Sequence, residues 1–350
     1  MLYIGVKEMQ RLVRKIGLAQ VIKDIAVAIE EDFRRWEEFE TIPRLASHTA
    51  EGVVELMPTS DSVHYGFKYV NGHPKNYEFG LQTVTAFGVY ADMKTGYPLL
   101  LSEMTIATAL RTAAMSALAA KYLARPDSQT MALIGNGCQA EFQAEAFRAV
   151  LGVTQLRLYD VDVKSSRKLM KNLKGKGFDI TLCESAAEAV EGADILTTVT
   201  ADKKQATILS DNMVGSGVHI NAIGGDCPGK TELAPDILSR GRVFVEYEEQ
   251  SRIEGEIQQM PDGFPVTELW RVFSGQEAGR QSDDEITVFD SVGFAIEDFA
   301  TLRYLHLKAH ETGLYRKLDL LAVPGDPRDL YGLTMQRAGF WSKLASVFGK

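Results

Sequence analysis

The chain has 350 residues, of which 45% are hydrophobic and 24% charged, a composition typical of a globular protein long enough for two domains. Its 38 Lys and Arg stand against 47 Asp and Glu, and the formal net charge of -9 gives no overall attraction to phosphate backbones or anionic lipid. We therefore expect neither a nucleic-acid partner nor a membrane partner.

Targeting and metal-binding patterns are also missing from the sequence. The N-terminal segment lacks the basic and apolar regions of a secretory signal, and no apolar run approaches the roughly 20 residues of a membrane span. The three cysteines lie far apart without a CxxC pair, which predicts neither a disulfide framework nor a zinc site. His306 and His310 share a predicted helix face, but two ordinary helix histidines explain them better than a metal does. We expect a cytoplasmic protein that binds no metal.

The first third of the chain predicts helices followed by a β-rich unit. Residues 1–40 place apolar residues at helical spacings among charged ones. A helix is predicted from Ser102, as its N-cap, to Leu123 before Arg125-Pro126. Between them, alternating or aromatic-rich segments predict strands over residues 52–57, 65–70, 83–92 and 97–103.

The rest of the chain alternates short apolar runs with helical patterns, which predicts a parallel sheet built from βαβ units. A closing strand is predicted over residues 287–293, followed by a helix over about 294–311 that carries the chain back toward the first unit. The other predicted strands span residues 131–135, 156–160, 195–201, 218–224 and 242–247.

A dinucleotide-binding pattern follows the first of these strands. Gly135-Asn136-Gly137-Cys138-Gln139-Ala140 has the GxGxxA spacing, in which the glycines allow a tight turn and close approach to a pyrophosphate at a helix N-terminus. Asp160 ends the next strand, about 20 residues on, where a carboxylate would bind the ribose hydroxyls and repel a 2′-phosphate. The competing interpretations are a purely structural turn and a helix N-cap at Asp160. The pattern favours NAD over NADP.

The loop after residues 218–224 is the first place to look for catalytic groups, because ligands bind beyond the carboxyl ends of parallel strands. It places a carboxylate, Asp226, four residues before an ammonium, Lys230. Taken alone, the segment would be read as a surface turn with a capping Asp. Next to a nicotinamide, however, a carboxylate suits proton transfer with a substrate amine. Asp226 is therefore the leading catalytic candidate.

Charged residues in the β-rich unit predict a site for an amino acid. Lys68 points away from the aromatic face of its strand, Glu55 shares a face with Val53 and Met57, and Arg111 lies in a small, apolar helix. Each alone is more often a rim charge or an ion pair. Together they offer cations for a carboxylate and an acid for an ammonium group.

Long segments of the chain closely resemble the ornithine cyclodeaminase and mu-crystallin family. The resemblance implies an α/β protein, with an α+β substrate-binding and dimerisation domain over 1–125, completed by about 311–350, and a Rossmann-type NAD-binding domain over 126–310. It also implies a homodimer. The similar segments are ASH (46–48), VELMP (54–58), FKYVNGHP (67–74), LSEMTIATALRTAA (101–114), ALIGNG (132–137), GGDCPGKTEL (224–233), RIEGEIQQ (252–259) and TVFDSVGFAIED (287–298).

The resemblance further implies a role for individual residues. Arg44 and Lys68 would bind the substrate carboxylate with help from Arg111, Glu55 would face the substrate amines, and Asp226 would be the catalytic acid and base. Val292 would lie against the substrate. NAD would be contacted by Thr83, Arg111, Gly135, Gly137, Cys138, Gln139, Asp160, Thr200, Ile220, Asn221, Ala222, Ile223, Lys230 and Ser291.

The activity implied by the resemblance is the conversion of L-ornithine to L-proline and ammonia by internal hydride transfer through bound NAD, a step in ornithine and arginine catabolism. Alternatives within the family are an NAD-dependent amino-acid dehydrogenase, a lysine cyclodeaminase and a ketimine reductase. A non-catalytic, crystallin-like binding protein is the alternative from another class, and the presence of Asp226, Lys68 and Arg111 together speaks against it.

Overall fold

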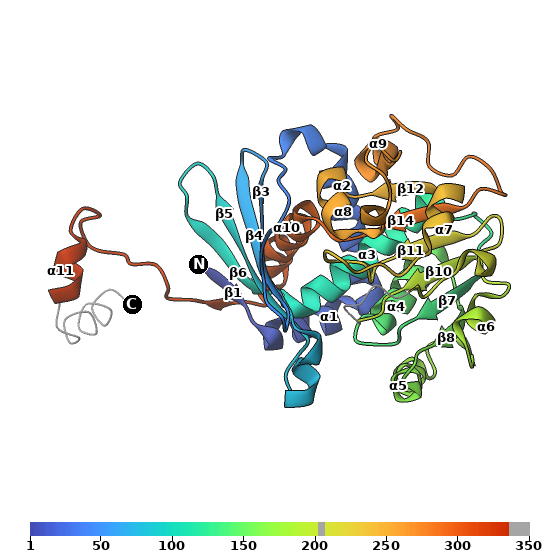
Figure 1. The fold of residues 1–350 in the computed structure, drawn as a ribbon. Coiled ribbons are helices and arrows are strands. Elements are labelled where there is room, and N and C mark those ends of the chain that lie inside the picture. The colour runs from blue at the N-terminus through green and yellow to red at the C-terminus, as the bar shows by residue number, and fades with distance from the viewer. Residues whose placement is uncertain (202–206, 336–350) are drawn as a thin grey trace.

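The computed structural model describes residues 1–201 and 207–335, which form two sheets with helix α3 (Thr105–Leu123) between them (Figure 1). The first sheet has the strand order β15-β1-β6-β5-β4-β3-β2, mostly antiparallel, with β1 parallel to β6. Helices α1 (Val6–Ile16) and α2 (Leu18–Arg34) belong to the same unit. The strands span β1 (Leu2–Ile4), β2 (Leu45–His48), β3 (Val53–Ser60), β4 (His64–Gly72), β5 (Val84–Asp92), β6 (Pro98–Glu103) and β15 (Arg316–Lys317).

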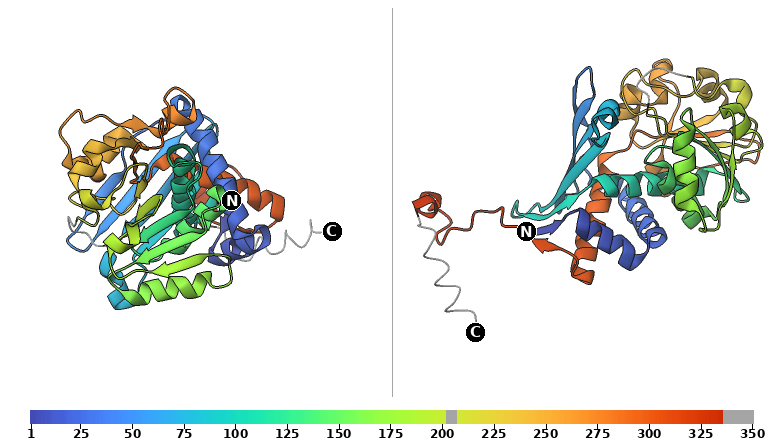
Figure 2. Two further views of the ribbon diagram at one scale, coloured as in Figure 1. Left: turned by 90° about the vertical axis from the view of Figure 1, so that its right-hand side faces the viewer. Right: turned by 90° about the horizontal axis from the view of Figure 1, so that it is seen from below.

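The second sheet is entirely parallel in its described pairings, with the order β13-β12-β14-β11-β10-β7-β8-β9 (Figure 2). The order reverses between β7 and β10, so the chain leaves the two strands in opposite directions and a crevice opens at their carboxyl ends. The strands span β7 (Thr130–Ile134), β8 (Gln155–Tyr159), β9 (Asp179–Leu182), β10 (Ile195–Thr198), β11 (His219–Ala222), β12 (Arg242–Val245), β13 (Thr267–Glu268) and β14 (Thr287–Asp290).

Short helices connect these strands, as a parallel sheet requires. The last strand in chain order, β14, is inserted between β11 and β12 rather than added at an edge. The helices are α4 (Ala140–Leu151), α5 (Val163–Leu173), α6 (Ala186–Val190), α7 (Pro235–Arg240), α8 (Glu248–Glu254) and α9 (Leu269–Phe273), with 3-10 turns η1 (Trp36–Glu38), η2 (Pro74–Phe79), η3 (Asp211–Met213) and η4 (Glu256–Gln259).

Helix α3 lies in contact with both units, packing on α2 and β5 of the first and on β11 and β14 of the second. Its sequence, TIATALRTAAMSALAAKYL, is buried on nearly every side, which is why small alanines rather than an apolar stripe dominate it. Arg111 is buried in this helix. The continuous packing of α3 joins the two units and brings Arg111 to the space between them.

Two predictions of element boundaries were wrong. Ser102 is not an N-cap, because β6 continues to Glu103 and the helix begins at Thr105. The Glu103 carboxylate accepts a hydrogen bond at 2.7 Å from the Ile106 N–H, one of the N-terminal amides that have no partner within the helix. Residues 1–40 are helical except at their start, where Leu2–Ile4 pair with β6. Long-range strand pairing overrode the local pattern at both places.

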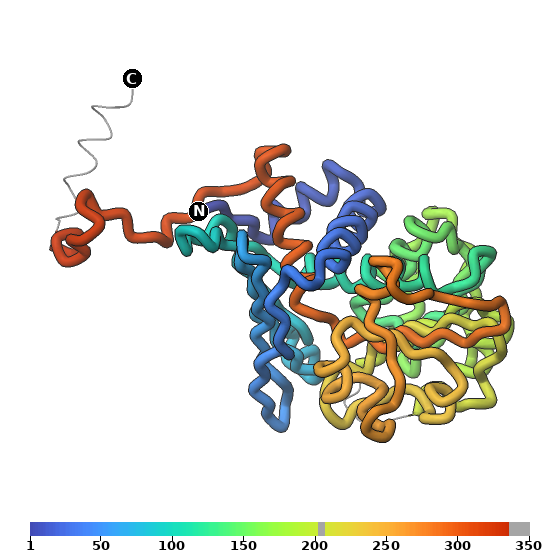
Figure 3. Tube along the Cα trace, turned by 90° about the horizontal axis from the view of Figure 1, so that it is seen from above, coloured from blue at the N-terminus to red at the C-terminus, as the bar shows by residue number. Residues whose placement is uncertain are grey.

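Helix α10 (Ala295–Thr312) follows β14 and leaves the parallel sheet at once. It packs against α2 and against β3, β4 and β5 of the first sheet. The chain then pairs β15 with β1, and residues 318–335, with α11 (Leu330–Met335), extend away from the two units (Figure 3). The division of the chain at residue 310 remains a prediction, and α10 contacts the first unit already in its first turn, where Asp298 binds Lys68.

Within residues 1–201 and 207–335, every helix is too short or too polar to cross a membrane. The cysteines Cys138, Cys183 and Cys227 form no disulfide.

Candidate active site

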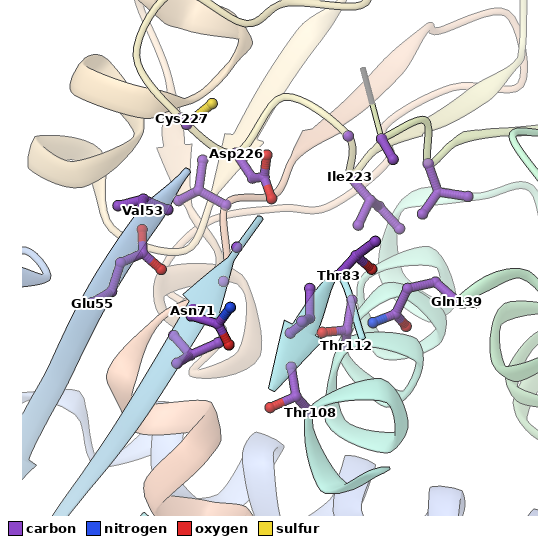
Figure 4. A pocket seen from close by; sticks show the side chains of 18 of the residues that line it. Val53, Glu55, Asn71, Thr83, Thr108, Thr112, Gln139, Ile223, Asp226 and Cys227 are labelled. Atoms are coloured by element: carbon purple, nitrogen blue, oxygen red, sulfur yellow. The ribbon is translucent and has the colours of Figure 1, made fainter. Parts of the chain in front are cut away.

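A pocket lies where the first sheet faces the carboxyl ends of the parallel strands, beside the crevice between β7 and β10 (Figure 4). One wall is built from β3, β4 and α3, and we call it the first-sheet wall. The other is built from the loops that follow β7, β10, β11 and β14, and we call it the loop wall. Glu55 on the first-sheet wall and Asp226 on the loop wall both border the cavity.

Strand alternation brings two charges to the first-sheet wall. On β3, Glu55 shares its face with Val53 and Met57, and β3 pairs with β4 so that Met57 lies opposite Lys68. The side chains of Glu55 and Lys68 are 7% and 1% exposed, whereas the aromatic residues beside Lys68 on the other face are only half-buried. The face predicted for Lys68 is confirmed.

The two buried cations of this wall share an anion. Lys68 Nζ donates to Asp298 Oδ1 at 2.9 Å, and Arg111 Nε donates to the same oxygen at 3.1 Å. Arg111 also donates to Glu297 Oε2 at 2.9 Å. Burial, followed by the charge of Arg111, lowers the pKa of Lys68 to about 8. The first turn of α10 therefore holds both cations at the pocket.

Arg44 is held by both units. It donates to Glu55 Oε2 at 3.1 Å and lies 3.0 Å from Glu254 Oε2, and its other end donates to the carbonyls of Val292 and Gly293. Burial raises the pKa of Glu254 to about 7, and Arg44 opposes that rise. The contacts of Arg44 tie the first-sheet wall to the loop wall.

The glycine-rich turn has the geometry that its spacing predicted. Gly135 adopts a φ of +90°, and a Cβ there would lie 2.7 Å from the Val199 carbonyl oxygen at the β7–β10 crevice. Gly137 has open space around its Cα, and α4 begins soon after at Ala140. The turn thus leaves room beside free N–H groups at a helix N-terminus, which suits a pyrophosphate.

Asp160 lies beside this turn at the end of β8. Its carboxylate accepts hydrogen bonds from the N–H of Asn136 at 2.6 Å and of Asp162 at 2.8 Å. The N-cap of α5 is Asp162, whose side chain accepts from the Lys164 N–H. The helix-capping interpretation of Asp160 was therefore wrong, and its carboxylate is directed at the glycine-rich turn.

The loop after β11 places Asp226 at the mouth of the pocket. Its side chain is 55% exposed and lies 3.5 Å from Lys230 Nζ, which is buried and donates to the Thr200 carbonyl at 2.9 Å. Burial lowers the pKa of Lys230, but the Asp226 and Glu232 carboxylates and Cys227 together oppose this effect, and the net result is a raised pKa. Lys230 thus joins the loops after β10 and β11 and keeps a positive charge beside Asp226.

Comparison with known proteins identifies the family of this chain. Residues 6–313 match the model of the ornithine cyclodeaminase/mu-crystallin family. The chain belongs to this family. A protein of Brucella suis biovar 1 named ornithine cyclodeaminase is 63% identical over 334 residues, which cover 95% of this chain and 93% of that protein.

Two solved structures have the same fold over almost their whole length. One, described by its recognition of L-lysine, L-ornithine and L-2,4-diaminobutyric acid, is a lysine cyclodeaminase with a TM-score of 0.89 and 31% identity, covering 95% of this chain and 99% of that one. The other is an archaeal alanine dehydrogenase dimer with bound NAD, with a TM-score of 0.83 and 33% identity, covering 92% and 99%.

Most of the residues to which the family resemblance gave a role come together in the pocket of this family member. Gly135 and Asp160 do not border it: Gly135 begins the glycine-rich turn and Asp160 accepts from the Asn136 N–H of that turn. Ile220, Asn221 and Ala222 lie in the interior strand β11 with no exposed surface, so their contact with NAD remains a prediction. Of the residues with a predicted role, those that border the cavity are Arg44, Glu55, Lys68, Thr83, Arg111, Gly137, Cys138, Gln139, Thr200, Ile223, Asp226, Lys230, Ser291 and Val292.

Sequence reasoning missed three acidic residues that hold the cations. Glu297 and Asp298 follow the closing strand directly, at the edge where ligands bind, so their position was a usable signal. Glu254 lies in a helix without such a signal. Thr108 and Thr112, one turn apart on α3, also border the pocket and were missed (Figure 4).

Proposed function

We propose that this chain is an ornithine cyclodeaminase, which converts L-ornithine to L-proline and ammonia with NAD as its cofactor. The observation that carries the proposal is the charge pattern of the pocket. Buried cations at Lys68 and Arg111 stand on one side, and carboxylates at Glu55 and Asp226 border the same cavity. This pattern complements an amino acid that has one carboxylate and two amino groups. The 63% identical relative named for this activity supports it.

The residues around the glycine-rich turn fit NAD. Gly135 has the positive φ and the closeness to β10 that leave no room for a side chain, and Gly137 leaves its Cα open toward the pocket. We assign the pyrophosphate to the N–H groups of Cys138 and Gln139, before α4, and the adenosine ribose to Asp160. When bound, NAD supplies first the oxidising and then the reducing equivalent at the substrate Cα, so no external oxidant is consumed.

The first-sheet wall would bind the substrate. Lys68 and Arg111, with Arg44, would donate hydrogen bonds to the substrate carboxylate, and Glu55 would face the substrate amines. Both Lys68 and Arg111 are positioned by Asp298 before any ligand arrives, which lowers the ordering cost of binding. The burial of these groups also keeps water from the reacting end of the substrate.

Asp226 would act as the acid and base. Its carboxylate is exposed to the pocket and lies 3.5 Å from the Lys230 ammonium. It would take a proton from the α-amino group of ornithine. Loss of hydride from Cα, for which bound NAD would be the acceptor, would leave an imine carbon that the neutral δ-amine would attack to close the five-membered ring. Asp226 would return the proton to the departing ammonia, and return of the hydride to the cyclic imine would give proline.

We further propose that two copies associate through the outer face of the first sheet. Leu45 and Phe87 are 58% and 42% exposed there, and Tyr65, Phe67 and Tyr69 extend the same apolar face. Exposed apolar faces of this kind mark sites of protein–protein contact. The NAD-bound archaeal relative is described as a dimer. Sedimentation should give a homodimer, and Phe87→Glu should give monomers. A cytoplasmic location is proposed with it, in keeping with Cys138 and Cys183, which form no disulfide.

The closed redox cycle offers the test of the activity. We expect L-ornithine deuterated at Cα to yield proline that keeps deuterium at Cα, with no steady-state rise in NADH absorbance and many turnovers from substoichiometric NAD. Ring closure by a tethered amine is fast, since effective molarities reach roughly 10⁵ M or more. A one-for-one rise of NADH with ornithine consumed would instead identify an amino-acid dehydrogenase.

A further inference from the structure

Behind the loop wall lie three buried carboxylates that do not line the pocket described above. Asp290, Glu256 and Glu232 are 0%, 0% and 1% exposed. Among residues 1–201 and 207–335, none of the three forms an ion pair within 4.0 Å. Burial raises the pKa of Asp290 to about 7, and burial followed by the charge of Asp290 raises the pKa of Glu256 to about 8. Keeping such groups is costly, so they require an explanation.

Each of these carboxylates binds the backbone of the segment that carries the next. The two oxygens of Asp290, at the end of β14, accept from the N–H groups of Glu256 at 2.7 Å and Ile257 at 3.0 Å. The two oxygens of Glu256 in turn accept from the N–H groups of Glu232 at 2.7 Å and Leu233 at 3.0 Å. The contacts therefore run from the sheet to the segment after the Asp226 loop.

Glu232 ends this chain of contacts at the pocket. Its Oε2 accepts from the Gly224 N–H at 3.1 Å, and its Oε1 accepts from the Thr200 N–H at 3.0 Å and from the Thr200 hydroxyl. Gly224 and Thr200 both border the cavity, on the loops after β11 and β10. Asp226 lies between Gly224 and Glu232 and so is fixed from both sides.

Three glycines leave the space that these carboxylates occupy. A Cβ on Gly224 would lie 2.1 Å from Glu232 Oε1, and one on Gly225 would lie 2.6 Å from Glu256 Oε1. A Cβ on Gly255 would lie 2.5 Å from Asp290 Oδ2. None of the three glycines has a positive φ, so space rather than backbone conformation requires them. Each carboxylate thus has its own glycine at contact distance.

We propose that Asp290, Glu256 and Glu232 form a positioning relay that holds the Asp226 loop against the Thr200 loop in the geometry needed for catalysis. The proposal rests on the function proposed above. The relay residues act through the backbone and touch neither substrate nor cofactor. Both oxygens of Glu256 accept from backbone N–H groups, and these bonds favour its ionised form against the upward pKa shift that burial causes. An amide must instead turn an NH₂ group toward one of the two backbone N–H donors. Exchanging one carboxylate for an amide should therefore release one end of a loop.

The variant Glu256→Gln tests the relay, with ornithine turnover and hydrogen-exchange mass spectrometry as readouts. We expect kcat to fall about 10- to 100-fold, because a displacement of about 1 Å at a reacting group costs about that much. The KM for ornithine and the Kd for NAD should stay within about threefold. Backbone amides in peptides covering residues 224–233 should exchange faster. Gly225→Ala, which presses on Glu256 without changing a charge, should act in the same direction.

Asp194→Asn is the control for a carboxylate-to-amide change elsewhere in the same sheet. Asp194 Oδ2 accepts from the N–H groups of Gln129 at 2.9 Å and Thr130 at 3.0 Å and Oδ1 pairs with Arg125, at the opposite end of the parallel sheet. It should lower the Tm without changing kcat or exchange in residues 224–233. Unchanged kcat and unchanged exchange in Glu256→Gln would overturn the relay, as would a loss of kcat matched by Asp194→Asn. If the unaltered protein makes no proline, the proposed function fails, and the exchange data still decide whether the relay holds the loop.

Discussion

The first-sheet wall meets the pocket with charged side chains that are buried and paired, whereas the loop wall carries its catalytic candidate, Asp226, on an exposed side chain beside the buried Lys230. Lys68 and Arg111 are fixed by direct ion pairs to Asp298. The loops that flank Asp226 are fixed through their amides by carboxylates that form no ion pair within the part of the chain that the structure describes. Both walls use buried acids, but one orients side chains and the other orients main chain.

This difference separates binding from chemistry. A cation locked in place by an ion pair offers a constant target for the substrate carboxylate, which suits recognition. A carboxylate that exchanges protons needs some access to the cavity, and its position must come from the loop that carries it. Changes to the first-sheet wall should therefore affect substrate affinity, and changes to the loop wall should affect the rate.

The largest effect is expected for Asp226→Asn. An amide keeps the size of the side chain but cannot take up the proton, so kcat should fall at least about 100-fold. Binding of NAD and ornithine, measured by calorimetry, should change little. Asp236→Asn, an exposed acid in the first turn of α7, is the control and should keep full activity. Near-normal turnover by Asp226→Asn would move the proton carrier to another residue.

The first-sheet wall is tested by Lys68→Met and Arg44→Ala. Each removes a charge-assisted bond to the substrate carboxylate, which is worth about 1.5 to 3 kcal/mol, so the KM for ornithine should rise about 10- to 100-fold. The Kd for NAD should stay within about threefold. Lys121→Met, at a 52% exposed position on α3, serves as the control. Equal losses for both ligands would indicate misfolding rather than a lost substrate contact.

We expect cofactor choice to depend on Asp160, which follows β8 and binds the backbone of the glycine-rich turn. The unaltered protein should turn over at least about tenfold more slowly with NADP than with NAD, since two like charges at about 4 Å repel by about 1 to 4 kcal/mol. Asp160→Ser should narrow this ratio. Asp162→Asn, which can still cap α5, should leave the ratio within about twofold of the original. Comparable NADP turnover in the unaltered protein would refute the role of Asp160.

The smallest expected effect is a pH dependence of anion binding. The pKa of Lys68 is lowered to about 8, so its ammonium is present below pH 8 and is lost above it. The inhibition constant of pentanoate, whose own carboxylate does not titrate there, should rise about three- to tenfold between pH 7 and 9.5. Lys68→Met should abolish that slope. A flat profile in the unaltered protein would show that Lys68 stays charged or does not meet the carboxylate.

Local patterns identified much of this molecule. The parallel strands, the positive φ at Gly135 and the placement of Asp226 beyond a strand end follow from residue types at short spacing. The same reasoning misplaced Ser102, because the end of β6 is set by its pairing with a neighbouring strand and not by the residues around it. Where neighbours in sequence decide a conformation, pattern reasoning succeeded.

The partners of the charged groups could not be predicted from local sequence patterns. Lys68 meets Asp298 across 230 positions, and Arg44 meets Glu254 from the other unit. The relay from Asp290 through Glu256 to Glu232 joins segments that only the insertion of β14 between β11 and β12 brings together. Residue type and spacing were sufficient for the strands, the glycine-rich turn and the chemistry on offer, because these depend on local backbone geometry. Which acid neutralises which base, and which loop each carboxylate holds, was decided by the packing of the two sheets, since burial makes an unpaired charge or amide too costly to leave without a partner.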